Sequence, residues 1–189
     1  MGAIDMSGAR HRARRLSPSV LRWALALSAT GVIGAWCANV SAQPLMQANI
    51  SVALARQVVD AVIAECSRPG DLVTVTIAIV DRAGQPVMQV KADTAASPLP
   101  WELAFRKAYT AVSVRRTSLE WREMTAGDSD LAGQRMLSNM IPLGGGAPIM
   151  FGNQAIGAVG VSGAQGGQPA DDACAKAGAA AIADELDQN

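Results

Sequence analysis

The sequence is poor in histidine, aromatic residues and charge. Its 189 residues include one histidine, 4% aromatic residues and 17% charged residues, and 16 basic residues balance 16 acidic ones. This balance argues against a strongly basic nucleic-acid-binding protein. The 50% apolar content argues against intrinsic disorder. The length predicts a single domain, and we find no internal repeat or low-complexity tract.

Residues 1–42 have the composition of a secretory signal peptide. An uncharged apolar stretch, Trp23–Ala38, follows a basic cluster, and Val40–Ala42 offers small residues at a cleavage site. We expect cleavage after Ala42, which predicts a periplasmic or secreted protein without a membrane anchor. The basic cluster consists of Arg10, Arg12, Arg14, Arg15 and Arg22.

Other N-terminal signals fit the sequence less well. The apolar stretch is short for an uncleaved anchor, which needs about 20 apolar residues. Trp36 is too large for the position before a lipidated cysteine at Cys37. Arg14-Arg15 would begin a twin-arginine signal, but Leu16–Pro18 lacks the usual apolar continuation.

Removal of residues 1–42 leaves 11 basic and 15 acidic residues, a formal charge of −4, and no histidine, since His11 is lost. Nucleic-acid binding is therefore not expected. Two cysteines remain, Cys66 and Cys174, and an oxidising compartment favours a disulfide between them. Two buried free thiols are the alternative. Two thiolates without histidine make a poor metal site.

Hydrophobic periodicity predicts helices, two hairpins and an α+β fold. Residues 43–49 should be a flexible lead-in to a domain over residues 50–187. Because tight turns join consecutive strands, we expect a mostly antiparallel sheet with helices on its faces. The predicted elements are a helix capped by Ser51, strands Val73–Val80 and Gln85–Lys91, helix Trp101–Arg115, a short helix that starts at Thr117–Glu120, loops and helical turns over Thr125–Met140, strands Pro148–Phe151 and Ala155–Ser162, and a helix from Pro169 to Leu186. The segment Thr117–Glu120 fits a capping box.

Two glycine-rich segments invite a nucleotide-binding interpretation. Gly144–Gly146 lacks the Gly-Lys-Ser/Thr ending of a phosphate loop. Its glycines permit either close approach to something flat or bulky, or a plain bend. Gly157–Gly163 lacks the helix and acidic residue of a dinucleotide fingerprint, so a tightly packed strand is the better interpretation.

The predicted helix Trp101–Arg115 carries the strongest candidate site. Arg106, Tyr109 and Thr110 are three and four residues apart and share a face with a cation, a phenol and a hydroxyl. An anionic, flat ligand would suit this face, and a solvated outer face is the alternative. Arg115 and Arg116 are expected only to favour the helix C-terminus.

No nucleophile–base pair is evident. Asp81 or Glu102 could act as a carboxylate base on a small organic acid, in an isomerase or lyase, but nothing in the sequence selects either. The methionines are expected to fill the core rather than bind metal. They are Met88, Met124, Met136, Met140 and Met150.

Four segments together resemble the GlcG/HbpS family of haem-binding proteins, which is related to the C-terminal domain of PduO-type proteins. The segments are Val80–Gly84, Arg106–Ala111, Pro142–Ile149 and Gly157–Ala164. The resemblance covers roughly residues 50–187. It implies a profilin-like α-β-α sandwich with five strands, a homo-oligomer, and a cysteine pair, here Cys66 and Cys174, as in exported members.

The resemblance also implies a ligand site and a cofactor. The implied ligand-binding residues are Arg106, Lys107, Tyr109, Thr110, Thr117, Gly145 and Gly146. Some relatives have a histidine before this helix, where this chain has Ser97–Pro100, so an axial ligand to haem would be Tyr109, Thr110 or a methionine. We therefore expect an exported protein that binds haem for storage, sensing or handover without catalysis. The alternative is an accessory protein or enzyme for a small organic acid, with Arg106 holding the carboxylate.

Overall fold

The structure is a computed structural model that describes residues 43–67, 70, 72–95 and 97–187. The predicted signal peptide lies outside the described residues and stays a prediction. Residues 43–49 are mostly exposed and have no regular secondary structure. The chain joins the core at Ile50, whose N–H donates to the carbonyl of Ile156 at 3.0 Å. No helix in the described part of the chain has the length and apolar character needed to cross a membrane.

The elements follow the predicted order with shifted ends. They are α1 (Val52–Cys66), β1 (Thr76–Asp81), β2 (Pro86–Val90), α2 (Leu99–Val114), α3 (Ser118–Met124), the 3-10 helix η1 (Ala132–Met136), β3 (Gly146–Phe151), β4 (Gln154–Ser162), α4 (Gln168–Ala180) and α5 (Ala183–Asp187). The single C-terminal helix that we predicted is divided into α4 and α5. The chain turns between them at Ala181 and Ile182, and Ile182 is buried.

The four strands form one antiparallel sheet in the order β2-β1-β4-β3. This confirms the α+β class and the antiparallel pairing. The expectation of five strands, which came from the family resemblance, is wrong for the described residues. Residues 125–145, which separate α3 from β3, form turns and the 3-10 helix, so they add no strand. The likeness to profilin stays a prediction.

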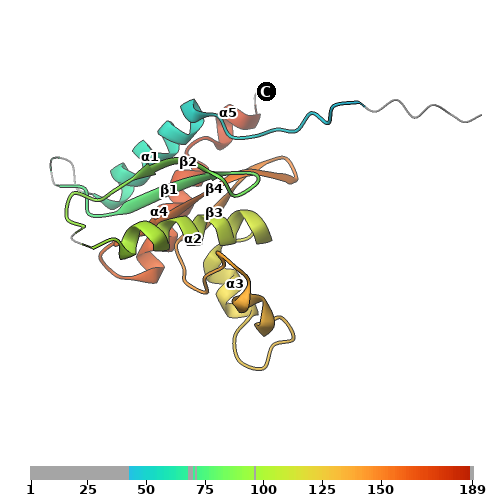
Figure 1. Ribbon diagram of the computed structural model, residues 1–189. Helices are drawn as coiled ribbons and strands as arrows, with labels where there is room; N and C mark the ends of the chain where they lie inside the picture. The colour runs from blue at the N-terminus through green and yellow to red at the C-terminus, as the bar shows by residue number, and fades with distance from the viewer. Residues whose placement is uncertain (1–42, 68–69, 71, 96, 188–189) are drawn as a thin grey trace, which may run out of the picture. The chain divides into compact units, whose positions relative to one another are not determined.

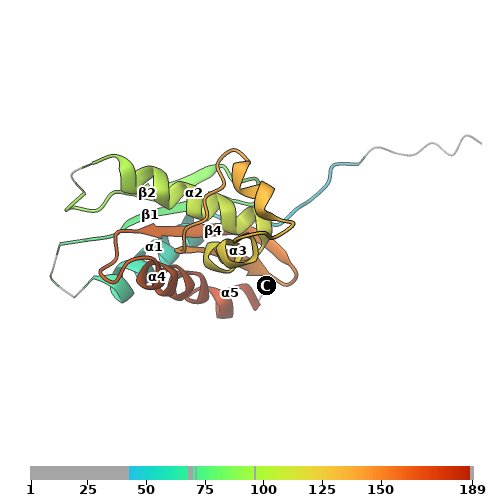
Figure 2. The same ribbon diagram turned by 90° about the horizontal axis from the view of Figure 1, so that it is seen from below.

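Helices cover both faces of the sheet. Helices α1 and α4 pack against each other and against one face, while α2 packs alone on the opposite face. Figure 2 shows these layers edge-on, with α2 on one side of the strands and α1 and α4 on the other. Figure 1 shows α3 projecting from the end of α2, away from α1. The candidate cavity lies at this C-terminal end of α2.

The two faces of the sheet differ in side-chain size. Large β-branched side chains such as Ile77, Ile79 and Val159 pack against α1 and α4 in the main core. Ala158 packs toward α2, and the register pairs two glycines there, Gly146 with Gly160. Period-two alternation along each strand produces this separation. The small residues allow α2 to lie close to the sheet.

Glycine is required at both positions. A Cβ at Gly160 would overlap the carbonyl oxygen of Ala104, and a Cβ at Gly146 would overlap the carbonyl oxygen of Lys107. Both carbonyls belong to α2. The close approach that we predicted for the glycine-rich bend is therefore made to a helix of the same chain.

A disulfide joins α1 to α4. Cys66 and Cys174 are bonded with their Cα atoms 5.9 Å apart, and 108 residues separate them in sequence. The sequence left open whether the two cysteines form a disulfide or stay as free thiols, and the structure contains the disulfide. Closing a loop of this length removes unfolded-state entropy worth about 5 kcal/mol in the chain-entropy model.

Candidate functional site

A cavity of about 700 Å³ opens beyond the C-terminal half of α2. Its wall comes from α2, α3 and the segment 131–140, and most of the lining is apolar. The lining residues are Tyr109, Ser113, Val114, Arg116, Trp121, Met124, Leu131, Gln134, Leu137, Ser138 and Met140. The volume lies within the range of roughly 300–1,000 Å³ that is typical of small-molecule sites.

A sharp reversal of the chain places α3 across the end of α2. Arg115 ends α2 with a left-handed backbone, at φ 52°. Thr117 then caps α3: its Oγ1 accepts from the N–H of Glu120 at 3.1 Å, and the Glu120 carboxylate accepts from the N–H of Thr117 at 3.0 Å. The capping box that the sequence predicts is therefore present. It directs Trp121 and Met124 toward the cavity.

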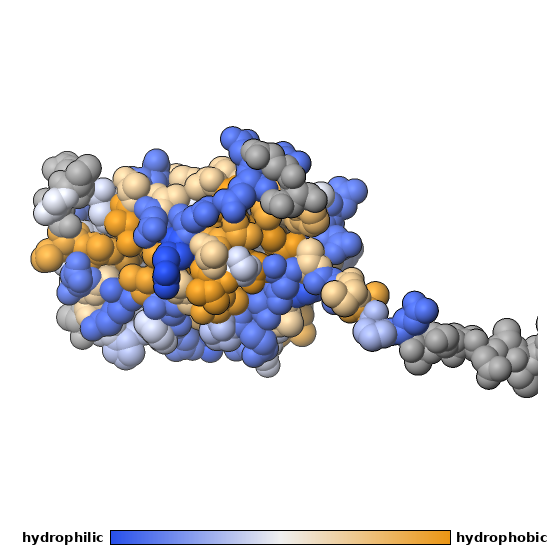
Figure 3. All heavy atoms as spheres, turned by 90° about the horizontal axis from the view of Figure 1, so that it is seen from above, coloured by the Kyte–Doolittle hydropathy of each residue, from blue (hydrophilic) through white to orange (hydrophobic). Residues whose placement is uncertain are grey.

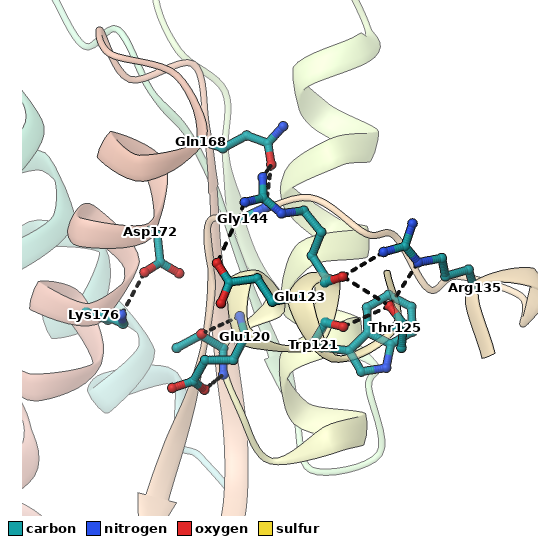
Figure 4. Close-up of polar contacts among 11 residues, drawn as sticks. Glu120, Trp121, Glu123, Thr125, Arg135, Gly144, Gln168, Asp172 and Lys176 are labelled. Carbon is teal, nitrogen blue, oxygen red and sulfur yellow. Dashed lines mark hydrogen bonds and ion pairs between the residues drawn. The ribbon is translucent and has the colours of Figure 1, made fainter. Parts of the chain in front are cut away.

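The outer wall is fastened to α3 by side chains of the 3-10 helix. Arg135 donates from Nε to Thr125 Oγ1 at 2.9 Å and from Nη2 to the carbonyl of Arg122 at 2.6 Å. Figure 4 shows Arg135 reaching across to Thr125 and this neighbouring carbonyl. The indole N–H of Trp121 also donates to Gln134 Oε1 at 3.2 Å. These contacts hold an irregular segment over the opening.

Strained backbone flanks the cavity. Arg115 and Asn139 are the non-glycine residues with positive φ in the described part of the chain, at 52° and 64°. They immediately adjoin the lining residues Arg116 and Met140. Residues held in such conformations occur at ligand sites more often than elsewhere, which supports this cavity as the functional one.

Tyr109 and Arg116 supply the reactive groups of the wall. The Tyr109 ring packs so closely on Gly84 of the β1–β2 turn that a Cβ there would lie 2.7 Å from it. Its hydroxyl makes no hydrogen bond with the described residues, and neither does the Arg116 guanidinium. The remaining polar groups are hydroxyls and one amide, and the lining contains no carboxylate or imidazole. The cavity therefore offers one phenol and one cation beside a mostly apolar wall.

Lys107, a predicted ligand group, lies in a buried ion pair. Its side chain is 2% exposed, and Nζ donates to Asp171 Oδ2 at 2.7 Å and to the carbonyl of Val161 at 2.9 Å. Burial lowers the pKa of Lys107, although the hydrogen bond and charge of Asp171 oppose this. Because Asp171 belongs to α4 and Lys107 to α2, the pair connects the two helical layers.

Thr110 is also used within the fold. Its side chain is buried, and Oγ1 donates to the carbonyl of Arg106 at 2.8 Å and accepts from the N–H of Ile141 at 2.9 Å. The second bond ties α2 to the chain that leaves the cavity wall. The Thr110 hydroxyl therefore already donates one hydrogen bond and accepts another within the fold.

The other predicted site residues do not line the cavity. Arg106 pairs with Glu102 on α2 at 2.6 Å. Gly145, at φ 118°, passes beside the Lys107 ammonium, and Gly146 lies beneath α2. Of the predicted ligand-binding residues, Tyr109 lines the cavity. Ligand binding by Tyr109 and by the other predicted residues stays a prediction.

Sequence reasoning missed most of the wall. Arg116 was expected only to favour the helix end, and Met124 and Met140 were expected to fill the core. Asp81, a candidate base, accepts from the N–H groups of Ala83 and Gln85, both at 2.8 Å, and so shapes the β1–β2 turn. The clearest sequence signal for the cavity is the set of large apolar residues Leu131, Leu137 and Met140, spaced through an otherwise irregular segment.

Two smaller hollows lie elsewhere. One, of about 340 Å³, surrounds the disulfide, and another, of about 420 Å³, lies between β2 and the start of α2. Neither contains any of the predicted ligand-binding residues. The cavity beside Tyr109 is therefore the candidate site.

The sequence pattern of a protein family described as "Haem degrading protein HbpS-like" matches residues 50–180. The chain belongs to this family, which confirms the resemblance drawn from its motifs.

Individual proteins show the same relationship. An uncharacterized 15.0 kDa protein from the dhaT-dhaS intergenic region of Citrobacter freundii is 30% identical over 118 residues, covering 61% of this chain and 81% of that protein. The crystal structure of a double mutant of Streptomyces reticuli HbpS is 27% identical with a TM-score of 0.64, covering 77% of this chain and 97% of that one. The crystal structure of a PduOC haem complex is 26% identical with a TM-score of 0.63, covering 71% and 96%.

Proposed function

We propose that this chain is an exported haem-binding protein and that the cavity beside Tyr109 is its haem site. The observation that carries the proposal is a cavity of about 700 Å³ with a mostly apolar wall and an unpartnered phenol. Membership of the HbpS-like family and the similarity to PduOC, whose structure is a haem complex, support it.

The wall has groups that suit each part of haem. The ring is flat and apolar, and Trp121, Met124 and Leu137 offer apolar contact. The propionates are anionic, and Arg116 can pair with a carboxylate through two parallel hydrogen bonds. Tyrosine is a known axial ligand of haem iron. Bound haem would supply a coloured ring and a redox-active iron.

We propose binding without turnover, for storage, sensing or handover. Proton transfer during catalysis needs a positioned acid or base, most often histidine or a carboxylate. The described residues that line the cavity include neither. The family description names haem degradation. An experiment must therefore separate haem binding alone from haem binding followed by degradation.

Haemin titration of the purified protein tests the proposal. We expect a saturable, shifted Soret band and parallel quenching of tryptophan fluorescence, with Arg116→Gln weakening the binding. A spectrum identical to that of free haemin would refute it. Loss of the band under air with ascorbate, at a rate above that of free haemin, would contradict binding without turnover. A thermal shift with small carboxylic acids and none with haemin would favour the organic-acid alternative.

Export and assembly are further parts of the proposal. Mass spectrometry of the protein from the native host should show a chain that begins after Ala42; an intact N-terminus would contradict export.

Figure 3 shows apolar areas among hydrophilic residues on the face that includes α1. Exposed apolar areas of this kind are common at subunit contacts, so we propose a homo-oligomer. Light scattering that gives the monomer mass would contradict this.

A further inference from the structure

We propose that Tyr109 makes the cavity selective for porphyrins that carry a trivalent, oxygen-preferring metal ion, over divalent and metal-free porphyrins. This inference rests on the proposed haem-binding function and goes beyond it, because it assigns the metal class that the site selects. It depends on which donor atoms the cavity offers and which the fold has already used.

The fold removes most alternative donors. The Thr110 hydroxyl is buried and donates to Arg106 while accepting from Ile141. Lys107 Nζ is held by Asp171 and Val161. The chain's one histidine, His11, falls within the predicted signal peptide.

On the wall itself, the Ser113 hydroxyl donates to the carbonyl of Tyr109, and the Gln134 amide oxygen accepts from Trp121. Four donors remain on the wall: the phenol of Tyr109, the hydroxyl of Ser138, which would be a weak neutral ligand, and the thioethers of Met124 and Met140. The phenol makes no hydrogen bond with the described residues, so coordination would break no contact within the fold. Thioethers are soft ligands that favour metals in low oxidation states, whereas a phenolate is a hard, anionic ligand. The identity of the donor therefore determines the preferred metal charge.

Charge strengthens this preference. A porphyrin contributes two negative charges, so a trivalent metal leaves the coordinated ring with one positive charge and a divalent metal leaves it neutral. When Tyr109 binds, its phenol transfers a proton to water and its oxygen donates an electron pair to the metal, with no change in oxidation state. Attraction between the phenolate and a positive centre is stronger beside apolar side chains, which exclude part of the screening water, than in bulk solvent.

Four protoporphyrin IX derivatives test the inference: the Fe(III), Ga(III), Zn(II) and metal-free forms. Each is titrated into the full exported protein, and binding is followed by Soret absorbance and by quenching of tryptophan fluorescence. Ga(III) is not reduced under these conditions, so it separates metal charge from redox chemistry. We expect the Fe(III) and Ga(III) forms to bind about tenfold or more tightly than the other two.

Two variants assign the effect. Tyr109→Phe keeps the ring against Gly84 and should remove the difference in affinity between the trivalent forms and the other two. Met140→Leu is the matched control on the same wall and should keep the difference. Circular dichroism and thermal unfolding check that both variants fold.

The outcomes separate this inference from the proposed function. If no porphyrin binds, the proposed function fails and the inference fails with it. If all four bind equally, or if Met140→Leu removes the preference instead of Tyr109→Phe, haem binding stands and the inference is overturned.

Discussion

Replacing Lys107 with methionine tests whether this lysine serves the fold or the ligand. The resemblance to the family assigned Lys107 to the ligand, whereas the structure places its ammonium between Asp171 and the carbonyl of Val161 with 2% of the side chain exposed. Methionine has a similar length and fills the same space. It removes the charge and both hydrogen bonds.

The expected cost follows from what the substitution leaves behind. Loss of a hydrogen bond to a charged group costs about 1.5–3 kcal/mol, and an unpaired buried carbonyl costs about 1–3 kcal/mol. The Asp171 carboxylate also loses its counter-ion, although its Oδ1 still accepts from the N–H of Ala164 at 2.8 Å. We expect Lys107→Met to reduce the free energy of unfolding by about 3–5 kcal/mol, the range for breaking a buried pair from one side.

Urea unfolding at pH 7 measures this cost, and a second variant identifies its source. In Lys107→Met with Asp171→Asn, the buried charge is gone while the bond from Ala164 can remain. This double variant should therefore recover most of the loss.

Haem titration of the folded single variant completes the test. We expect an affinity close to that of the wild type, because Lys107 does not line the cavity. A variant that loses less than about 1 kcal/mol and no longer binds haem would refute the structural role and return Lys107 to the ligand site.

Four further predictions concern the glycines, the disulfide, pH and the cavity wall. Gly160→Ala should cost several kcal/mol, because its Cβ would overlap the α2 carbonyl of Ala104, whereas Gly133→Ala, which has open space, should be nearly neutral in urea unfolding. Cys66→Ala with Cys174→Ala should lower the free energy of unfolding by about 5 kcal/mol, and a reductant should remove the difference from the wild type. Because burial lowers the pKa of Lys107 below 10.5, the unfolded chain binds more protons in the window between the two values, so the wild type should gain stability as the pH rises through it. Lys107→Met should lack this gain. The same dependence of stability on pH in the variant and the wild type would contradict the assignment to Lys107. Arg135→Gln should weaken haemin binding with little loss of stability, and unchanged binding would show that the 3-10 helix does not shape the site.

Local patterns predicted the elements well because their causes are local. Alternating apolar residues gave the strands, and the spacing from Thr117 to Glu120 gave the capping box that starts α3. The number of strands in the sheet came instead from the family resemblance, and it was one too many for the described residues. Likewise, no local signal marked the turn at Ile182, since burial of that side chain depends on the completed core.

The buried position of Lys107 was within reach of sequence analysis. It lies three residues after Ala104 and four before Ala111, which are both fully buried, so helical periodicity places it on the apolar face of α2. Its charge alone suggested a ligand or a solvated surface. Recognising the ion pair would have required its partner Asp171, 64 residues away, and sequence spacing carries no information about that distance.

The cavity itself depends on contacts that no local pattern encodes. Its outer wall is irregular and takes its position from Arg135 on Thr125 and from the N–H of Ile141 on Thr110. The glycines and alanines of the sheet, by contrast, hold α2 close along most of its length. Where α2 runs past this small-residue face, α3 and the 3-10 helix replace the sheet as its neighbours, and their larger side chains leave space. The motifs shared with the family thus fix α2 against the sheet. In the proposed function, Tyr109 and Arg116 would contact the ligand at the end of α2 where this close packing stops.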